Sequence, residues 1–301
     1  MAGLCAGRIV IVTGAGRGLG RAYALAFARA GARVVVNDLG TTLAGVGRDA
    51  ATAQVVVDEI HAAGGEAVAN GDDVSEWDGA GRIVAAALER FGGLDVVVNN
   101  AGFVRDRMFV SATLEEWDAT IKVHLRGHFC VTRQAVDYWR GCAKQGKPVD
   151  ARIINTSSGA GLNGSIAQSA YAAAKGGIAS LTLVQAAELQ RYGITANALA
   201  PAARTRMTEQ AFAEKMKRPP SGFDLQDPDN IAPVVVWLGS PQSRTVSGCV
   251  FELEGGKIMI ADGWNDGPQV DKQARWAPEE VGAAVSALLA QRRAQKKVYG
   301  T

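Results

Sequence analysis

Three side chains in the middle of the sequence have the types and the spacing that proton transfer at a substrate oxygen requires. Tyr171 and Lys175 lie four residues apart, so in a helix they share one face. A tyrosine with an ordinary pKa of about 10 is a poor base at neutral pH, and a neighbouring ammonium group favours its phenolate form. Ser158 follows a predicted strand, where its hydroxyl can hydrogen-bond to the same substrate oxygen. The three residues therefore predict acid–base chemistry at a hydroxyl or carbonyl carbon.

A glycine-rich segment near the start of the chain predicts a dinucleotide site. Residues 13–20 read Thr-Gly-Ala-Gly-Arg-Gly-Leu-Gly and stand between a predicted strand and a predicted helix. Glycines at this junction allow a tight turn and let a pyrophosphate approach the amides of the helix N-terminus. A purely structural glycine turn is the alternative, but the strand before and the helix after favour the dinucleotide. The predicted contacts in this segment are Gly14, Arg17, Gly18, Leu19 and Gly20.

The choice of dinucleotide depends on two side chains of opposite charge. Asp38 ends the second predicted strand, where a carboxylate accepts hydrogen bonds from ribose hydroxyls and repels a 2′-phosphate. Arg17 acts in the other direction, because a guanidinium group in the glycine loop could reach such a phosphate. The carboxylate should dominate, since the long arginine side chain can turn away. NAD is therefore predicted as the cofactor in preference to NADP.

Short runs rich in Val and Ile alternate with longer amphipathic stretches along most of the chain. The predicted strands are residues 8–12, 32–37, 66–70, 94–99, 152–156, 194–199 and 250–253. The predicted helices are residues 20–30, 50–63, 80–91, 114–141, 169–192 and 231–239. Strand–helix alternation with nearly continuous apolar strands indicates a doubly wound, parallel, seven-stranded sheet of the α/β class. One Rossmann domain is expected over residues 1–255.

Two later segments depart from this alternation. Residues 205–227 contain Met207 and a Pro-Pro pair, and are expected to form a helical flap whose apolar residues line a substrate pocket or simply pack on the body. Residues 255–276 look irregular, and residues 278–295 resume helical periodicity. A C-terminal helical extension, residues 256–301, is therefore expected to pack on the same domain.

Composition argues against several other classes of protein. The 301 residues include 32 Lys and Arg against 30 Asp and Glu, which gives no electrostatic reason to expect nucleic acid as a partner. The four cysteines and three histidines lack the spacing of a zinc site, so no metal is predicted. No apolar run approaches the length of about 20 residues that a membrane span needs. The sequence favours a cytoplasmic enzyme that acts on a small molecule.

The motifs together resemble those of the short-chain dehydrogenase/reductase family. The matching segments are Thr13-Gly14-x3-Gly18-x-Gly20, Asp73-Val74, Asn99-Asn100-Ala101-Gly102, Ser158, Tyr171-x3-Lys175 and Asn197-x3-Pro201. They stand in the order and at the spacing of that family over about the first 255 residues. The resemblance implies a sheet of strand order 3-2-1-4-5-6-7 and a homodimer or homotetramer.

The resemblance also implies a role for each matching residue. Tyr171 is the general acid/base, Ser158 positions the substrate oxygen, and Lys175 tunes Tyr171 and holds the nicotinamide ribose. Asp73 and Val74 face the adenine. The segment that shapes the cofactor cleft contains Asn99, Ala101 and Gly102.

Two positions differ from the family pattern. His124 stands where the family usually has an asparagine that holds a water near the lysine. This histidine could join a proton path directly or be an imidazole packed at the edge of the cleft. The family's Pro-Gly pair is Pro201-Ala202 here, so the nicotinamide contacts expected from Pro201, Ala203 and Thr205 stay open.

Several further segments resemble one branch of the family, namely the (3R)-hydroxyacyl-CoA dehydrogenase units of peroxisomal multifunctional enzyme type 2, also called 17β-hydroxysteroid dehydrogenases, and their bacterial stand-alone relatives. These segments are residues 35–40, 105–107, 117–127 and 206–208. The resemblance implies NAD-dependent interconversion of a (3R)-hydroxyacyl-CoA and a 3-ketoacyl-CoA, with a fatty or steroid acyl group near Met207. The alternatives are a dehydrogenase of free steroids or other secondary alcohols, and a dinucleotide-binding regulatory protein without turnover.

Overall fold

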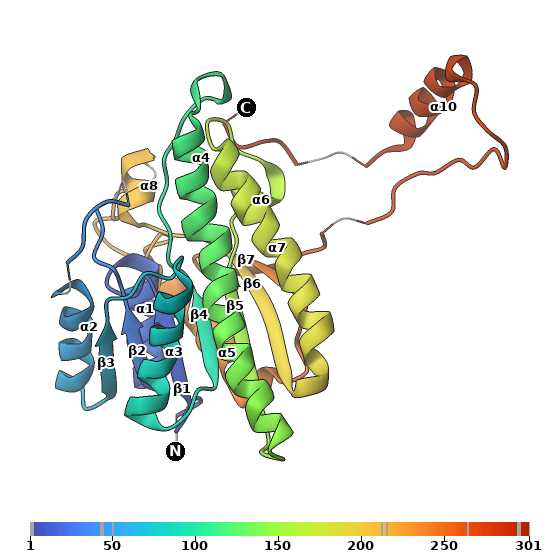
Figure 1. Ribbon diagram of the computed structural model, residues 1–301. Helices are drawn as coiled ribbons and strands as arrows, with labels where there is room; N and C mark the ends of the chain where they lie inside the picture. The colour runs from blue at the N-terminus through green and yellow to red at the C-terminus, as the bar shows by residue number, and fades with distance from the viewer. Residues whose placement is uncertain are drawn as a thin grey trace.

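A single twisted sheet forms the centre of the molecule (Figure 1). The computed structural model describes residues 3–42, 45–49, 51–211, 213–214, 216–263, 265–293 and 296–300. Within them the strands are β1 (Ile9–Thr13), β2 (Arg33–Asn37), β3 (Glu66–Asn70), β4 (Val96–Asn99), β5 (Ala151–Thr156), β6 (Ile194–Ala202), β7 (Val250–Glu254) and β8 (Lys257–Ala261). Their order is β3-β2-β1-β4-β5-β6-β7-β8. The predicted doubly wound α/β fold and the order of its first seven strands are therefore confirmed.

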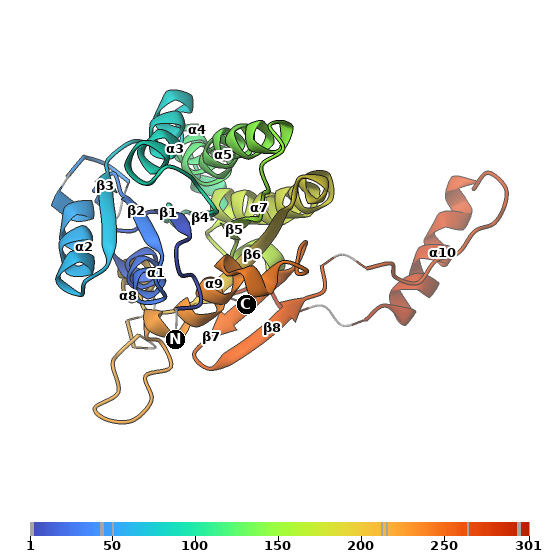
Figure 2. The ribbon, with the colours of Figure 1, turned by 90° about the horizontal axis from the view of Figure 1, so that it is seen from below.

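Helices cover both faces of the sheet (Figure 2). The helices of the described residues are α1 (Gly18–Arg29), α2 (Ala51–Ala62), α3 (Trp77–Phe91), α4 (Leu114–Ile121), α5 (Gly127–Lys144), α6 (Gly159–Asn163), α7 (Ser169–Leu189), α8 (Arg206–Ala211), α9 (Ala232–Gly239) and α10 (Pro278–Gln291), of which α10 lies away from the sheet. Short 3-10 turns span Phe109–Ser111, Gln190–Tyr192, Pro228–Asn230 and Pro241–Ser243.

Two buried clusters hold these layers together. Alternate residues of β1 point to opposite faces: Val10 and Val12 pack with α1, α2 and α9, whereas Ile9 and Ile11 pack with α3, α5 and α7. The central strands are buried on both faces, which explains why they read as continuous apolar runs in the sequence. The carboxyl ends of β1, β4 and β5 consequently meet at one edge, where the candidate site lies.

The eighth strand was not among the predicted elements. β8 pairs antiparallel with β7, and Gly255 and Gly256 form the two-residue turn between them. Gly255 has a φ of +54°, which glycine adopts readily. The expectation of an irregular segment directly after residue 255 was therefore wrong. A Gly-Gly pair between two short apolar runs is a hairpin signal that the sequence contained.

The single long helix predicted over residues 114–141 is also interrupted. A π-helical turn, Lys122–Arg126, lies between α4 and α5 and contains His124. Such turns insert one residue into the helical ladder and often occur at functional sites. The apolar periodicity of the segment did not reveal this change.

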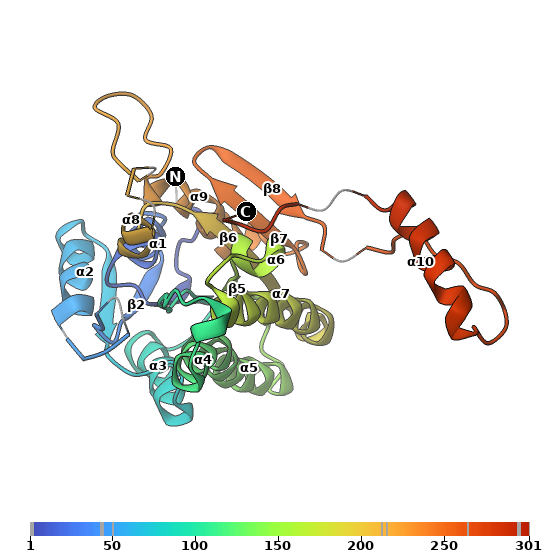
Figure 3. The same cartoon turned by 90° about the horizontal axis from the view of Figure 1, so that it is seen from above.

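The C-terminal segment leaves the body after β8 and returns to it at its end. Figures 1 and 3 show α10 at the far end of this arm, away from the sheet. No residue of α10 is buried. The predicted helix is therefore present, but it does not pack on the sheet or its covering helices. The division of the chain at residue 255 stays a prediction.

Candidate active site

The predicted glycine loop lines a pocket at the carboxyl edge of the sheet. Eleven of the predicted cofactor contacts are among its lining residues: Gly14, Arg17, Gly18, Leu19, Gly20, Asp38, Asp73, Val74, Ala101, Gly102 and Thr205. Gly14 and Gly18 have φ values of +62° and +53°, and a Cβ on Gly20 would lie 2.1 Å from the Gly14 carbonyl oxygen. The pocket opens at the N-terminus of α1, where backbone amides favour an anion. These features fit a dinucleotide.

The loop keeps this shape because β4 braces it. Asn100 Nδ2 donates to the carbonyl oxygens of Thr13 at 3.0 Å and Gly14 at 3.1 Å. Thr13 Oγ1 accepts hydrogen bonds from the backbone amides of Asn100 at 2.9 Å and Ala101 at 3.1 Å. The glycine loop and the segment after β4 are therefore one hydrogen-bonded unit. Asn100 was not among the predicted contacts, although the motif that contains it was recognised.

Asp38 organises the neighbouring loops as well as facing the pocket. Its Oδ2 accepts from the amide of Gly16 at 2.8 Å, and its Oδ1 accepts from the amide of Gly40 at 2.7 Å. A Cβ on Gly16 would lie 2.9 Å from Oδ2, so the loop passes very close to the carboxylate. Each carboxylate oxygen retains capacity to accept a further hydrogen bond from a ribose hydroxyl.

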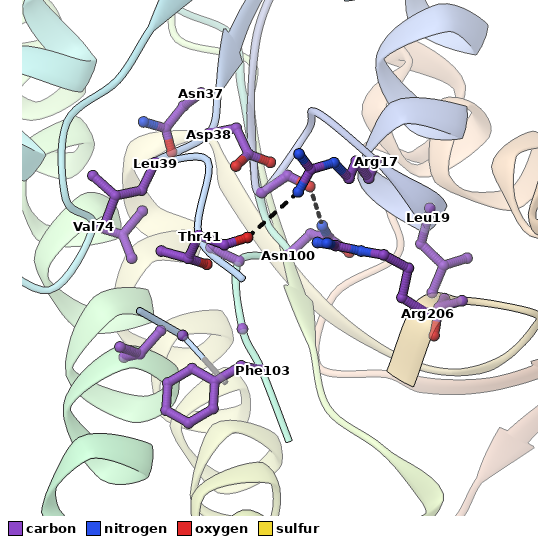
Figure 4. A pocket seen from close by; sticks show the side chains of 18 of the residues that line it. Arg17, Leu19, Asn37, Asp38, Leu39, Thr41, Val74, Asn100, Phe103 and Arg206 are labelled. Carbon is purple, nitrogen blue, oxygen red and sulfur yellow. Dashed lines mark hydrogen bonds between the residues drawn. The ribbon is translucent and has the colours of Figure 1, made fainter. Parts of the chain in front are cut away.

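Two arginines give the pocket positive charge (Figure 4). Arg17 donates to the Thr41 carbonyl oxygen at 3.4 Å and to Thr52 Oγ1 at 3.1 Å, so its side chain lies along the second loop. Arg206, the first residue of α8, also lines the pocket and points into the same space. Burial, followed by the nearby charge of Arg17, lowers the pKa of Arg206, and the charge of Asp38 opposes this shift. Two cations close together suit an anionic ligand between them.

The proton-transfer residues meet beside this pocket. Ser158 is the N-cap of α6, and its Oγ accepts from the Ala160 amide at 3.2 Å. Tyr171 lies in the first turn of α7, and an interaction with the Ser158 side chain lowers its pKa. Lys175, one turn further, is 3% exposed and its Nζ donates to the Thr156 carbonyl oxygen at 2.6 Å. The Nζ atom lies 5.6 Å from the centroid of the Tyr171 ring. The structure thus brings the three predicted side chains together.

Burial changes the pKa of both Tyr171 and Lys175. Burial raises the pKa of Tyr171 above its ordinary value, the hydrogen bond with Ser158 lowers it, and the charge of Asp106 raises it. Burial also lowers the pKa of Lys175 to about 7. Among the causes that act on Tyr171, the hydrogen bond with Ser158 is the one that favours the phenolate.

His124 lies between the cofactor cleft and Tyr171. Its ring meets the Tyr171 ring edge-on at a centroid distance of 5.3 Å, and its Nε2 lies 2.7 Å from the Phe103 carbonyl oxygen. Burial, aided by the charge of Lys175, lowers the pKa of His124 to about 3, so the ring is neutral at physiological pH. Its Nδ1 is buried and has no hydrogen-bond partner among the described residues. A Cβ on Gly102 would lie 2.3 Å from the ring, so glycine is needed there.

Some predicted contacts lie away from the pocket. Asn99 is buried and its side chain donates to Thr132 Oγ1 and Asn155 Oδ1, so it ties strands together. Pro201 is in β6 and Ala203 is buried in the core. The side chain of Met207 lies outside the described residues, and no role of it can be read from the fold.

Other lining residues were not predicted as contacts. They are Asn37, Leu39, Thr41, Thr42, Gly45, Asp72, Asn100, Phe103, Val123 and Arg206. Most follow directly after β2, β3 or β4, so the rule that ligands bind at the carboxyl ends of parallel strands would have found them.

The described part of the chain lacks two other kinds of feature. It contains no group of three or more His, Cys, Asp or Glu residues that could hold a metal ion. None of its helices is long and apolar enough to cross a membrane.

Comparison with known proteins agrees with this geometry. The family model for short chain dehydrogenases matches residues 8–216. The chain is 42% identical to hydroxyacyl-CoA dehydrogenase ChsB1 of Mycobacterium tuberculosis, over 98% of this chain and 92% of that protein. It is 45% identical to mouse peroxisomal multifunctional enzyme type 2 over 84% of this chain, but it spans only 32% of that larger protein. A crystal structure of a short chain dehydrogenase from Mycobacterium avium is 58% identical, with a TM-score of 0.90 over 99% of this chain and 100% of the other.

The chain belongs to the short-chain dehydrogenase family. It is an oxidoreductase, and enzymes of this family use a nicotinamide dinucleotide as cofactor.

The glycine loop generates a direct test of the dinucleotide site. Gly20→Ala places a methyl group against the Gly14 carbonyl oxygen and Asn100 Nδ2, so the loop must move away from the ligand position. We expect the Kd for NADH, measured by fluorescence titration, to rise by about tenfold or more, equivalent to about 1.4 kcal/mol. Gly141→Ala in α5 is the control, because its Cβ would meet nothing within 4 Å. Equal NADH affinity in both variants would contradict the assignment of this pocket.

Proposed function

We propose that the protein oxidises a (3R)-hydroxyacyl-CoA to a 3-ketoacyl-CoA with NAD as hydride acceptor. The observation that carries the proposal is the arrangement of Ser158, Tyr171 and Lys175 beside a dinucleotide pocket. The substrate class is supported by the name of the relative ChsB1, which matches over nearly its whole length. The mouse multifunctional enzyme supports it less directly, because the chain corresponds to only a part of that protein.

In the proposed mechanism the protein handles the proton at the substrate oxygen. The phenolate of Tyr171 accepts the hydroxyl proton as hydride leaves the carbinol carbon, and the same group returns the proton in the reverse direction. Ser158 holds the substrate oxygen next to Tyr171. The nicotinamide ring of the bound cofactor supplies the hydride acceptor.

Lys175 and His124 are proposed to position this centre. The Lys175 amine donates to the Thr156 carbonyl oxygen at the end of β5, and from there it would hold the ribose of the bound cofactor. His124 packs between Phe103 and Tyr171 and, because it is neutral, holds the ring of Tyr171 without competing for its proton. This favours the packed role of His124 over the role of a titrating relay.

The choice of NAD over NADP rests on Asp38. Its carboxylate is fixed by two backbone amides and faces the pocket next to Arg17. A 2′-phosphate there would meet a carboxylate that cannot turn away without breaking both hydrogen bonds. The proposal is therefore a preference for NAD, with Arg17 and Arg206 available to the pyrophosphate.

The rim of the candidate active site suits a long apolar substituent. Met108, Phe109 and Val110 are exposed on the loop after Arg107, and Ile166 is exposed on the loop that precedes α7. The two loops are joined by a hydrogen bond of 2.7 Å from the Arg107 amide to the Ala167 carbonyl oxygen. An exposed apolar surface on the loop that leads into α7, the helix of Tyr171, favours a fatty or steroid acyl chain over a small polar alcohol. A homodimer or homotetramer and a cytoplasmic location stay predictions.

The substrate proposal is tested by following NADH absorbance. The purified protein is mixed with NAD or NADP and with a long-chain (3R)-hydroxyacyl-CoA, its (3S) isomer or the matching free steroid alcohol. We expect the (3R) thioester to be oxidised with the highest kcat/KM and NAD to be preferred. Oxidation of the free alcohol alone would support the dehydrogenase of free alcohols. NADH binding without turnover of any substrate would support a regulatory dinucleotide-binding protein.

The proton-transfer role predicts a pH dependence. Oxidation requires the phenolate of Tyr171, and burial raises the pKa of this group, so kcat/KM for oxidation should increase as the pH rises into the alkaline range. Ser158→Ala removes the hydrogen bond that lowers this pKa. In this variant we therefore expect the rise of kcat/KM with pH to occur at higher pH. We expect turnover at pH 7 to fall by about 10²-fold or more. The matched control is Ser180→Ala, at an exposed position of α7. A pH profile of kcat/KM that is unchanged in Ser158→Ala would contradict the role of Ser158.

A further inference from the structure

The end of the described chain returns to the body and lies against the segment that joins Ser158 to Tyr171. The Ile166 amide donates to the Tyr299 carbonyl oxygen at 2.9 Å, and the Tyr299 amide donates to the Gly164 carbonyl oxygen at 3.2 Å. Ser165 and Tyr299 form an isolated parallel bridge. Figure 1 shows the C-terminus beside α6. We call residues 296–300 the tail.

The side chain of Tyr299 lies directly on the first residue of α6. A Cβ on Gly159 would come within 2.7 Å of Tyr299 Oη and 2.9 Å of its Cε2. Gly159 follows Ser158, the N-cap of α6, without an intervening residue. The tyrosine ring is therefore in contact with the backbone that carries the Ser158 hydroxyl.

The other side of α6 packs on the helix that carries Tyr171 and Lys175. A Cβ on Gly161 would lie 2.5 Å from both the Lys175 carbonyl carbon and the Gly176 nitrogen. Thus α6 lies between α7 and the tail, with a glycine at each contact. A helix of five residues has little stability of its own, so its position depends on what packs against it.

The loop between α6 and α7 also needs external support. Ala167 has a φ of +63°, a left-handed conformation that is unfavourable for a residue with a Cβ. The Arg107 amide holds Ala167 from one side, and Tyr299 holds Ile166 from the other. The tail itself is anchored on the sheet, because Lys296 Nζ forms an ion pair with Glu252 Oε1 of β7 at 2.9 Å.

We propose that the tail sets the position of Ser158 by pressing α6 onto α7, and that Tyr299 is a positioning residue for proton transfer. The inference rests on the proposed oxidoreductase function. It assigns to the C-terminal end of this chain a part in the substrate half of the active site. The dinucleotide pocket is lined by other segments, so its affinity should not depend on the tail.

The kinetic test compares Tyr299→Ala and Tyr299→Phe with the unmodified protein. The ring is 49% exposed, so its removal should leave the thermal unfolding temperature almost unchanged. For Tyr299→Ala we expect kcat/KM for the alcohol substrate to fall at least tenfold while the Kd for NADH stays within twofold. Tyr299→Phe keeps the ring atoms on Gly159 and should remain close to the unmodified protein. Unchanged kcat/KM in Tyr299→Ala would overturn the proposal.

A double-mutant cycle tests the contact itself. Gly159→Ala alone should reduce kcat/KM, because its methyl group displaces the Tyr299 ring or α6. In the Tyr299→Ala background the same substitution meets an open space and should have little further effect. If the loss of kcat/KM in the double variant equals the product of the losses in the two single variants, Gly159 and Tyr299 act independently. That result would contradict the proposal.

Hydrogen exchange separates this inference from the proposed function. In a chain that ends at residue 297 the Ile166 amide loses its acceptor, so we expect peptides over residues 158–171 to exchange faster while those of the glycine loop do not change. This readout needs no substrate. If the unmodified protein oxidises no alcohol, the proposed function fails, whereas unchanged exchange in the shortened chain overturns the role of the tail.

Discussion

The buried hydrogen bond from Lys175 Nζ to the Thr156 carbonyl oxygen is the interaction on which the active-site arrangement depends most. It joins the interior of α7 to the carboxyl end of β5 at 2.6 Å, in a place where water does not reach the amine. Because Tyr171 lies one turn earlier on the same helix, this bond also fixes the tyrosine beside Ser158. Burial lowers the pKa of Lys175 to about 7, so the buried amine is only partly protonated at neutral pH.

The fixed position of Lys175 and Tyr171 on α7 also links the substrate half of the site with the cofactor half. Burial of the ring, aided by the charge of Lys175, lowers the pKa of His124 to about 3 and keeps it neutral, and His124 packs between Phe103 and Tyr171. Phe103 follows the segment whose amides and Asn100 side chain brace the glycine loop. A chain of packed and hydrogen-bonded groups therefore runs from the catalytic helix to the dinucleotide pocket.

The sequence predicted those parts of the molecule that depend on local pattern. The Val-rich strands, the glycine loop and the Tyr171–Lys175 spacing each follow from periodicity or from a motif, and the family resemblance adds the order of the strands. Features that depend on packing between distant segments were not predicted. The π-helical turn at His124, the contact of Tyr299 with Gly159 and the hydrogen bonds of Asp38 all join residues far apart in the chain or break a regular pattern. The pKa of Tyr171 was likewise not predicted, because burial outweighs the hydrogen bond with Ser158.

The most direct test of the account is the comparison of Tyr171→Phe with the unmodified protein in two measurements, NADH binding and the rate of alcohol oxidation. Tyr192→Phe, outside the site, is the matched control. The account predicts that Tyr171→Phe binds NADH with nearly unchanged affinity and loses turnover by about 10³-fold, since the proton acceptor is absent but the dinucleotide pocket is intact. Near-normal turnover in Tyr171→Phe would contradict the proton-transfer role of Tyr171 and the mechanism built on it.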